Sequence, residues 1–147
     1  MKLINKYILI IFISINYCIT AIAADNLFEK AKKKFEKKDY EKSKFLFQRN
    51  IVFNPKNAES YLYLAKIFNT EENQEEEEKN LDTTLLLEPN NEEAIYMLIN
   101  IQLDRSNFEK ANTLMNRFTS VCKKMCNKKK EISKSLQDFE ANNEKTN

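Results

Sequence analysis

The fold is decided by residues 55–91, whose sequence is PKNAESYLYLAKIFNTEENQEEEEKNLDTTLLLEPNN. The motif Pro-x-Asn begins at Pro55 and again at Pro89, 34 residues later, and Ala31 precedes Ala65 by the same interval. Further matches at this period are Leu64 with Leu98, Phe53 with Leu87 and Val121, Leu27 with Tyr61 and Ile95, and Asp39 with Asn73 and Asn107. A fixed period of this length is typical of stacked supersecondary units rather than of one globular core.

Each period contains two helical patterns separated by a short break. In the middle period, apolar or small residues recur at the spacing i, i+3, i+4 and i+7 of an amphipathic helix, at Tyr61, Leu64, Ala65 and Phe68. We expect Asp39, Asn73 and Asn107 to cap the second helices, because their side-chain oxygens accept hydrogen bonds from the first free amides. The chain has no glycine and two prolines, so it lacks the residues of hairpin turns and phosphate loops. The sequence therefore predicts an all-α fold.

The repeat pattern resembles the tetratricopeptide repeat family over about residues 24–125. The family elements present are the small residue of the first helix (Ala31, Ala65), the pairs that open second helices (Asp39-Tyr40, Asn107-Phe108), the small residue after them (Ser43, Ala111) and the closing prolines. The chain departs from the pattern in three ways. No repeat has the two glycines of the family, Glu77 takes the small-residue position of the middle repeat, and Lys123 replaces the third proline.

The resemblance implies an α-solenoid of three helix-turn-helix hairpins and a C-terminal capping helix. We expect repeats at 24–57, 58–91 and 92–125, the capping helix at 126–141 and a disordered tail at 142–147. Ile132, Leu136 and Phe139 form the apolar stripe of the capping helix.

The resemblance also implies a groove, lined by the first helices, that receives a peptide. The inward residues would be Phe28, Lys32, Phe35, Leu62, Lys66, Asn69, Tyr96, Asn100 and Leu103. Lys32, Lys66 and Asn100 share one position of the repeat and form a polar ladder, which suits a peptide with a carboxylate or backbone carbonyls. The complete carboxylate-clamp set of the family is absent.

Residues 1–23 have the pattern of a secretory signal. Lys2 and Lys6 precede an apolar run, and small residues lead to a cleavage site after Ala23. The strongest apolar run is shorter than the ~20 residues that a bilayer requires, although an uncleaved membrane anchor is the alternative. We therefore expect a periplasmic or secreted protein, with membrane contact only if this segment is retained.

Composition excludes several classes of function. The chain has 24 basic and 22 acidic side chains, and loss of Lys2 and Lys6 with the signal would leave it balanced, so we expect no nucleic-acid partner. Histidine is absent, which removes imidazole-based triads and His-containing metal sites. We predict a non-enzyme with no cofactor and no metal.

Cys122 and Cys126 are the cysteines that would remain after export. An oxidising compartment favours a disulfide, and the repeat register places the required turn between them. We predict a structural bond that joins the third hairpin to the capping helix. The alternative is a redox-active pair, whose thiolate could be stabilised by Lys123, Lys124 and Lys128.

Two charged runs remain. The acidic residues between Glu71 and Glu78 suit a solvated turn and helix start, or attraction to a basic partner or a cation. The lysines between Lys123 and Lys134 suit a solvated capping face, or contact with anionic lipid.

The sequence predicts a non-catalytic scaffold for a protein or peptide partner. The alternatives are a thiol-redox accessory protein and a membrane-anchored subunit of an envelope assembly.

Overall fold

A computed structural model describes residues 26–144, and side chains through Asp138. This part of the chain contains helices and turns and no strand. The helices are 26–36, α2 (Tyr40–Phe53), α3 (Ala58–Thr70), α4 (Gln74–Leu87), α5 (Glu92–Asp104), α6 (Phe108–Val121) and α7 (Lys128–Glu144). The predicted signal at 1–23 lies outside the described residues.

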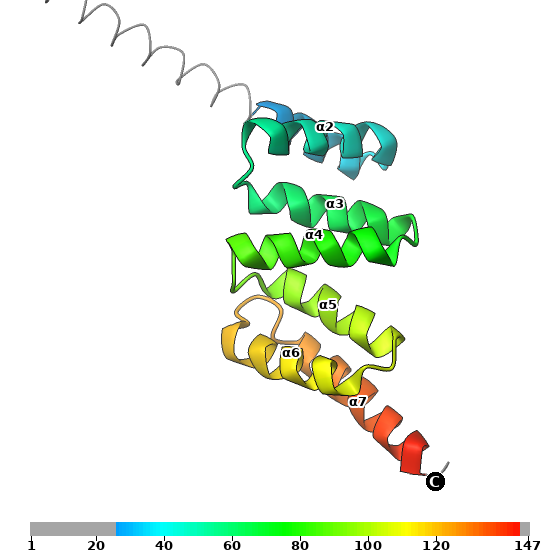
Figure 1. Cartoon of the computed structure of the whole chain (residues 1–147). Coiled ribbons are helices and arrows are strands. Elements are labelled where there is room, and N and C mark those ends of the chain that lie inside the picture. Colours follow the sequence, from blue (N-terminus) through cyan, green and yellow to red (C-terminus); the bar gives the residue numbers. More distant parts are fainter. Residues whose placement is uncertain (1–25, 145–147) are drawn as a thin grey trace, which may run out of the picture.

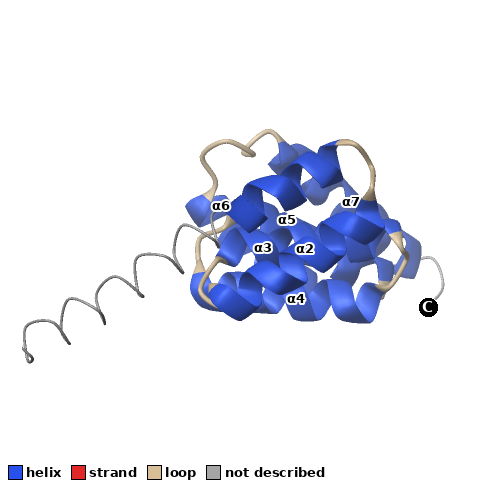
Figure 2. Cartoon of the chain, turned by 90° about the horizontal axis from the view of Figure 1, so that it is seen from above, coloured by secondary structure: helices blue, strands red, loops and turns tan. Residues whose placement is uncertain are grey.

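Successive helices run antiparallel and stack in chain order from α2 to α7 (Figure 1). Figure 2, which looks along the stack, shows the helices superposed in projection with the connecting loops at the two ends. α7 packs against both α6 and α5. The predicted fold class, an α-solenoid of three hairpins with a capping helix, is confirmed.

The turn inside each hairpin contains one residue in the left-handed region. These residues are Lys38, Glu72 and Ser106, with φ of 59°, 56° and 57°. In the third hairpin the N–H of Ser106 donates to the carbonyl of Leu103 at 2.9 Å and that of Asn107 to Gln102 at 2.8 Å. Glycine is favoured at such a position. Because the chain has none, a side chain with a Cβ occupies it three times.

Asparagine side chains cap four of the helices. Asn73 accepts from the N–H of Glu76 at 3.2 Å, and Asn107 accepts from that of Lys110 at 3.4 Å, as predicted. Asn57 and Asn91 cap α3 and α5 in the same way. The prediction for Asp39 is wrong.

The Asp39 carboxylate makes no capping hydrogen bond to α2. It binds the ammonium groups of Lys34 at 3.2 Å and Lys42 at 3.5 Å. The hydrogen bond from Lys34 is the main reason that the pKa of Asp39 is below its ordinary value. The neighbouring cations therefore orient this carboxylate away from the free amides of α2.

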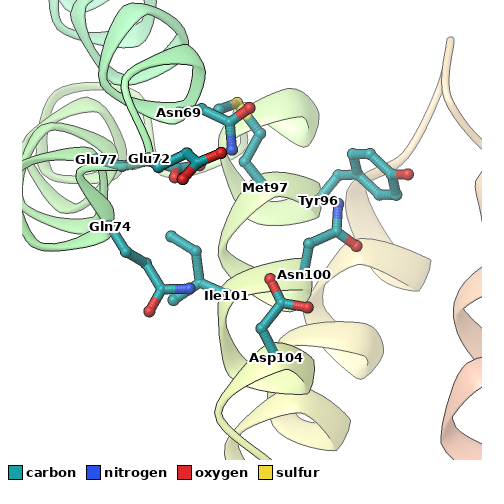
Figure 3. A pocket seen from close by; sticks show the side chains of 9 residues that line it. All are labelled: Asn69, Glu72, Gln74, Glu77, Tyr96, Met97, Asn100, Ile101 and Asp104. Atoms are coloured by element: carbon teal, nitrogen blue, oxygen red, sulfur yellow. The ribbon is translucent and has the colours of Figure 1, made fainter.

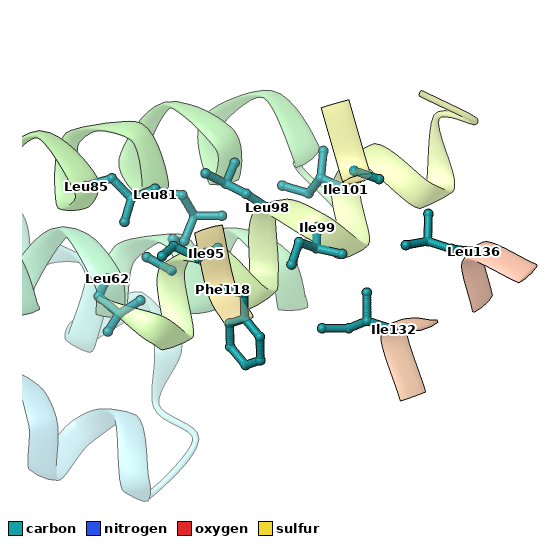
Figure 4. Packing of buried hydrophobic residues seen from close by; sticks show 13 residues of the cluster. Leu62, Leu81, Leu85, Ile95, Leu98, Ile99, Ile101, Phe118, Ile132 and Leu136 are labelled. Carbon is teal, nitrogen blue, oxygen red and sulfur yellow. The ribbon is translucent and has the colours of Figure 1, made fainter. Parts of the chain in front are cut away.

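The buried apolar residues form two clusters. The first joins helix 26–36, α2 and α3 through Phe28, Ala31, Phe47, Leu64 and Ile67. The second runs from α3 to α7, and its larger side chains are shown in Figure 4. Each hairpin thus buries its apolar face against the next one, as expected of a solenoid.

α7 closes this second cluster with Ile132 and Leu136, which are 2% and 7% exposed. The third residue of the predicted stripe, Phe139, lies beyond the described side chains. α7 begins at Lys128 rather than at 126, because Cys126 and Asn127 belong to the preceding turn. It continues through residues 142–144, the described part of the segment that we expected to be a disordered tail. No helix within residues 26–144 is long and apolar enough to cross a membrane.

Candidate functional site

Part of the predicted groove is occupied by an aromatic cluster around Tyr63. The ring centroid of Tyr63 lies 6.0 Å from Phe28, 5.1 Å from Phe35 and 5.0 Å from Phe47. Phe28 is 9% exposed and belongs to the first core cluster. Phe28 and Phe35 therefore pack mainly against other side chains at this end of the array.

Lys66, the middle member of the predicted ladder, is already paired. Its ammonium lies 2.8 Å from the Glu93 carboxylate and 4.8 Å from the centroid of the Tyr63 ring. Partial burial raises the pKa of the Tyr63 hydroxyl, which stays neutral and serves as an aromatic face for the cation. Lys66 thus contributes little free positive charge to the groove.

A pocket of about 480 Å³ opens between α3, the start of α4, and α5 (Figure 3). It brings together three predicted groove residues, Asn69, Tyr96 and Asn100. The other lining residues are Glu72, Gln74, Glu77, Met97, Ile101 and Asp104. The pocket has the size of a ligand site and contains apolar side chains from α5. Its lining includes several carboxylates, whereas the sequence led us to expect a ladder of basic and amide side chains.

Glu77 is the most buried of these carboxylates, with 4% of its surface exposed. Both carboxylate oxygens accept from the side-chain amide of Asn69 at 3.1 Å. Burial is the main reason that the pKa of Glu77 is above its ordinary value, and the charge of Asp104 raises it further. Figure 3 shows the Glu77, Glu72 and Asn69 side chains close together, facing Met97.

The remaining predicted groove residues lie apart from this pocket. Leu62 is buried and borders a second pocket of about 530 Å³, near Glu59, Glu88 and Lys124. Lys32 is half-buried on helix 26–36. Leu103 is half-buried against the second core cluster. The structure thus divides the predicted set between an aromatic cluster, two pockets and the core.

Tyr96 is partly covered by α7. Its hydroxyl donates to the Glu131 carboxylate at 2.8 Å, and the Lys128 ammonium lies 5.2 Å from the ring centroid. The Lys128–Glu131 hydrogen bond is the main reason that the pKa of Glu131 is low and that of Lys128 is high. The capping helix therefore borders the groove at its third repeat.

The turn between α6 and α7 contains the cysteine pair. The Cα atoms of Cys122 and Cys126 are 5.3 Å apart, and the two sulfurs are at bonding distance. The backbone N–H groups of Lys123, Lys124 and Met125, within this turn, donate to the Glu92 carboxylate at 2.8–3.1 Å. The turn is thereby fixed to the first residue of α5.

The sequence did not indicate that Tyr63, Glu72 and Asp104 belong to the groove region. Tyr63 and Asp104 are each one position from a predicted inward residue, and helical periodicity alone does not separate neighbouring positions at a groove edge. Glu77 did give a signal, since it replaces the small residue found at Ser43 and Ala111. Within the described residues, no cluster of Cys, Asp or Glu is suited to hold a metal ion.

Comparison with known proteins identifies the architecture. No protein-family model and no curated protein matches the sequence. Solved structures do match.

Three of these structures are tetratricopeptide-repeat domains or chaperones of similar shape. The first such domain of Spaghetti (RPAP3), bound to the HSP90 peptide SRMEEVD, has a TM-score of 0.66 at 17% identity, over 78% of this chain and 95% of that one. The Arabidopsis OM64 domain has a TM-score of 0.68 at 16% identity, over 82% and 96%. The Yersinia enterocolitica type III secretion chaperone SycD, in complex with a peptide of the translocator YopD, has a TM-score of 0.69 at 11% identity, over 81% and 93%.

These likenesses extend over most of both chains in each comparison. The protein therefore has the tetratricopeptide-repeat fold.

Proposed function

We propose that this protein is a non-catalytic scaffold that binds an extended segment of a partner protein in the groove between α3 and α5. The observation that carries the proposal is the pocket, which combines apolar side chains of α5 with polar groups that have spare hydrogen-bonding capacity. Asn100 is one of these, since its side chain makes no hydrogen bond to any described residue. Such a mixed lining suits a peptide, whose backbone needs hydrogen bonds and whose side chains need apolar contacts.

The similar structures support the same kind of function. The Spaghetti domain is bound to a peptide, and SycD is in complex with a peptide. At these identities the likeness concerns the fold, so the pocket of this chain has to supply the argument for binding. The chain also lacks histidine, and its carboxylates occupy helix faces and a groove rather than a catalytic arrangement.

Photocrosslinking in the native host tests the proposal. A photoreactive residue in place of Asn100 would face the groove, whereas one in place of Asn112, an exposed asparagine of α6, is the matched control. We expect position 100 to give a discrete crosslinked partner and position 112 to give none. Equal crosslinking at both positions would contradict a groove-based scaffold.

We further propose that the protein is exported and that the chain is cleaved after Ala23, as residues 1–23 predict. N-terminal sequencing of the protein purified from its host distinguishes a mature chain beginning at Ala24 from an anchored chain that retains Met1. We assign the Cys122–Cys126 pair a structural role, because it closes the turn that holds Glu92.

A further inference from the structure

The charges of the groove give information about the partner. The pocket between α3 and α5 is lined by Glu72, Glu77 and Asp104, and no described lysine or arginine lines it. None of these three carboxylates forms an ion pair with a described side chain. Arg105 follows Asp104 in the chain, but its guanidinium binds Glu78 and Gln74 instead. No ion pair within this part of the chain therefore balances these carboxylates, although the Arg105 guanidinium acts on Glu77 through its charge without contacting it.

Glu77 is an independent indication that this charge serves a ligand. It occupies the repeat position that Ser43 and Ala111 fill in the other hairpins, and all three side chains are buried. A small neutral residue fits this position without desolvating a charge, as the other two hairpins show. A buried carboxylate is unfavourable unless a cation or several hydrogen bonds compensate it. Among the described residues, the side-chain amide of Asn69 is the only hydrogen-bond donor to the Glu77 carboxylate.

The apolar side chains of the pocket complete the chemistry. Met97 and Ile101 face the carboxylates from α5, whereas the Tyr96 ring lies on another side of the same helix (Figure 3). Lysine and arginine side chains have a long apolar stem that ends in a cation. Such a stem would lie against Met97 and Ile101 while the cation reached Glu77 and Asp104.

The second pocket is also lined by more acidic than basic side chains. Glu59 and Glu88 line it with Leu62 and Lys124, near the opposite ends of α3 and α5. Glu92 and Glu93 also line it, but Glu92 binds the backbone of the α6–α7 turn and Glu93 binds Lys66. Lys66 lies between the two pockets along α3, and its ion pair with Glu93 leaves it little free charge. A segment that runs along the groove therefore meets carboxylates near both of its ends.

We propose that the bound segment is basic and inserts one lysine or arginine side chain between Glu77 and Asp104. This inference depends on the proposed function of the groove. The proposed ligand differs in charge from that of the Spaghetti domain, whose bound peptide SRMEEVD contains three acidic residues.

The test uses peptides selected from a random phage-displayed library on the immobilised full-length protein. The strongest binder is then synthesised with a fluorescent label, together with a variant in which its basic residue is replaced by glutamine. We expect lysine and arginine to be enriched at one peptide position. Loss of that charge should weaken binding about tenfold or more, as measured by fluorescence anisotropy.

Variants of the protein supply the second arm. Glu77→Gln and Asp104→Asn should each reduce affinity for the basic peptide about tenfold. Glu75→Gln, which removes an exposed carboxylate of the same helix outside the pocket, should change affinity by less than about twofold. Asp104 is exposed, so Asp104→Asn tests the charge even if Glu77→Gln impairs folding.

The outcomes separate the two proposals. Suppose that the selected peptides are neutral or acidic and that Asn100→Ala weakens their binding. This outcome would overturn the basic-segment proposal and leave the scaffold function supported. Selection of no binders, or of binders insensitive to Asn100→Ala and to both pocket substitutions, would overturn the groove as a binding site and this inference with it.

Discussion

The carboxylate of Glu92 accepts a hydrogen bond from the backbone N–H of Lys123 at 2.8 Å, so the first residue of α5 holds the turn that precedes α7. The N–H groups of Lys124 and Met125 donate to the same carboxylate. Partial burial alone would raise the pKa of Glu92, but the three backbone hydrogen bonds outweigh it and lower the pKa. A single side chain thus takes the place of the closing proline that the third repeat lacks.

Replacing Glu92 by glutamine should destabilise the protein by about 1–2 kcal/mol at neutral pH, because charge-assisted hydrogen bonds to the turn are lost at a partly solvated site. The pKa of Glu92 is lower in the folded chain than in the unfolded one. Its contribution is therefore complete above the ordinary value of 4.5 and is lost as the pH falls through the folded value. Urea unfolding at neutral pH and below pH 4.5 measures both effects.

Glu109→Gln is the control for this prediction, since Glu109 is an exposed first-turn glutamate of α6 whose carboxylate makes no hydrogen bond or ion pair with a described residue. It should change the unfolding free energy by less than about 0.5 kcal/mol. Equal losses for Glu92→Gln at both pH values would contradict the assigned role of the charge.

Glu77→Ala should stabilise the isolated protein by about 0.5–2 kcal/mol at neutral pH, the range for substitutions toward a repeat's own preferred residue. The physical reason is removal of a desolvated carboxylate from a position that Ala111 fills in the third hairpin. Thermal unfolding of the wild type and the variant measures the difference. Because the same substitution should weaken binding of a basic peptide, stability and binding are expected to change in opposite directions.

The pH dependence of the Glu77→Ala effect has the opposite sign to that of Glu92→Gln. The pKa of Glu77 is higher in the folded chain, so the wild type is destabilised as the pH rises from the ordinary value of 4.5 through the folded value. The advantage of the variant should therefore shrink below pH 4.5. An advantage that is constant with pH would show that packing, not charge, is its cause.

Glycine at the left-handed positions should also stabilise the fold. Lys38→Gly and Ser106→Gly should each add about 0.5–1 kcal/mol, because relief of the left-handed strain exceeds the added backbone entropy of the unfolded chain. Lys37→Gly, one residue earlier in the same turn and outside the set with positive φ, should not stabilise. Chemical denaturation of the three variants distinguishes the positions.

The sequence predicted the fold well because its strongest signals are periodic. Proline, asparagine and small residues recur at one spacing, and the structure places Asn73 and Asn107 at equivalent helix starts. Asp39 shares this position but differs in charge, so Lys34 and Lys42 compete with the free amides of α2. Repeat periodicity therefore predicted where α2 begins, although it did not predict that Asp39 would bind lysines instead of capping the helix.

The groove was harder to predict, because periodicity assigns a residue to a face of its helix but does not indicate which side chains it contacts. Phe28 and Lys66 were both predicted to face the groove, yet each contacts the ring of Tyr63, which the repeat pattern does not distinguish. The acidic character of the pocket arises because Glu72 and Glu77, from α4 and the preceding turn, meet Asp104 of α5 only after the hairpins stack. Glu77 was visible in advance only as a departure from the repeat.

The cysteine pair and Glu92 should act as a coupled unit. If the disulfide is formed, the double substitution Cys122→Ser and Cys126→Ser should cost about 2 kcal/mol, the chain-entropy contribution of so short a loop. Such a bond would also fix the turn whose amides bind Glu92, so Glu92→Gln should cost less in the serine background than in the wild type. A double-mutant cycle by urea unfolding, with alkylation and mass spectrometry to verify the oxidation state, measures this coupling. Additivity within about 0.5 kcal/mol would mean that the Glu92 contact organises the turn without help from the disulfide.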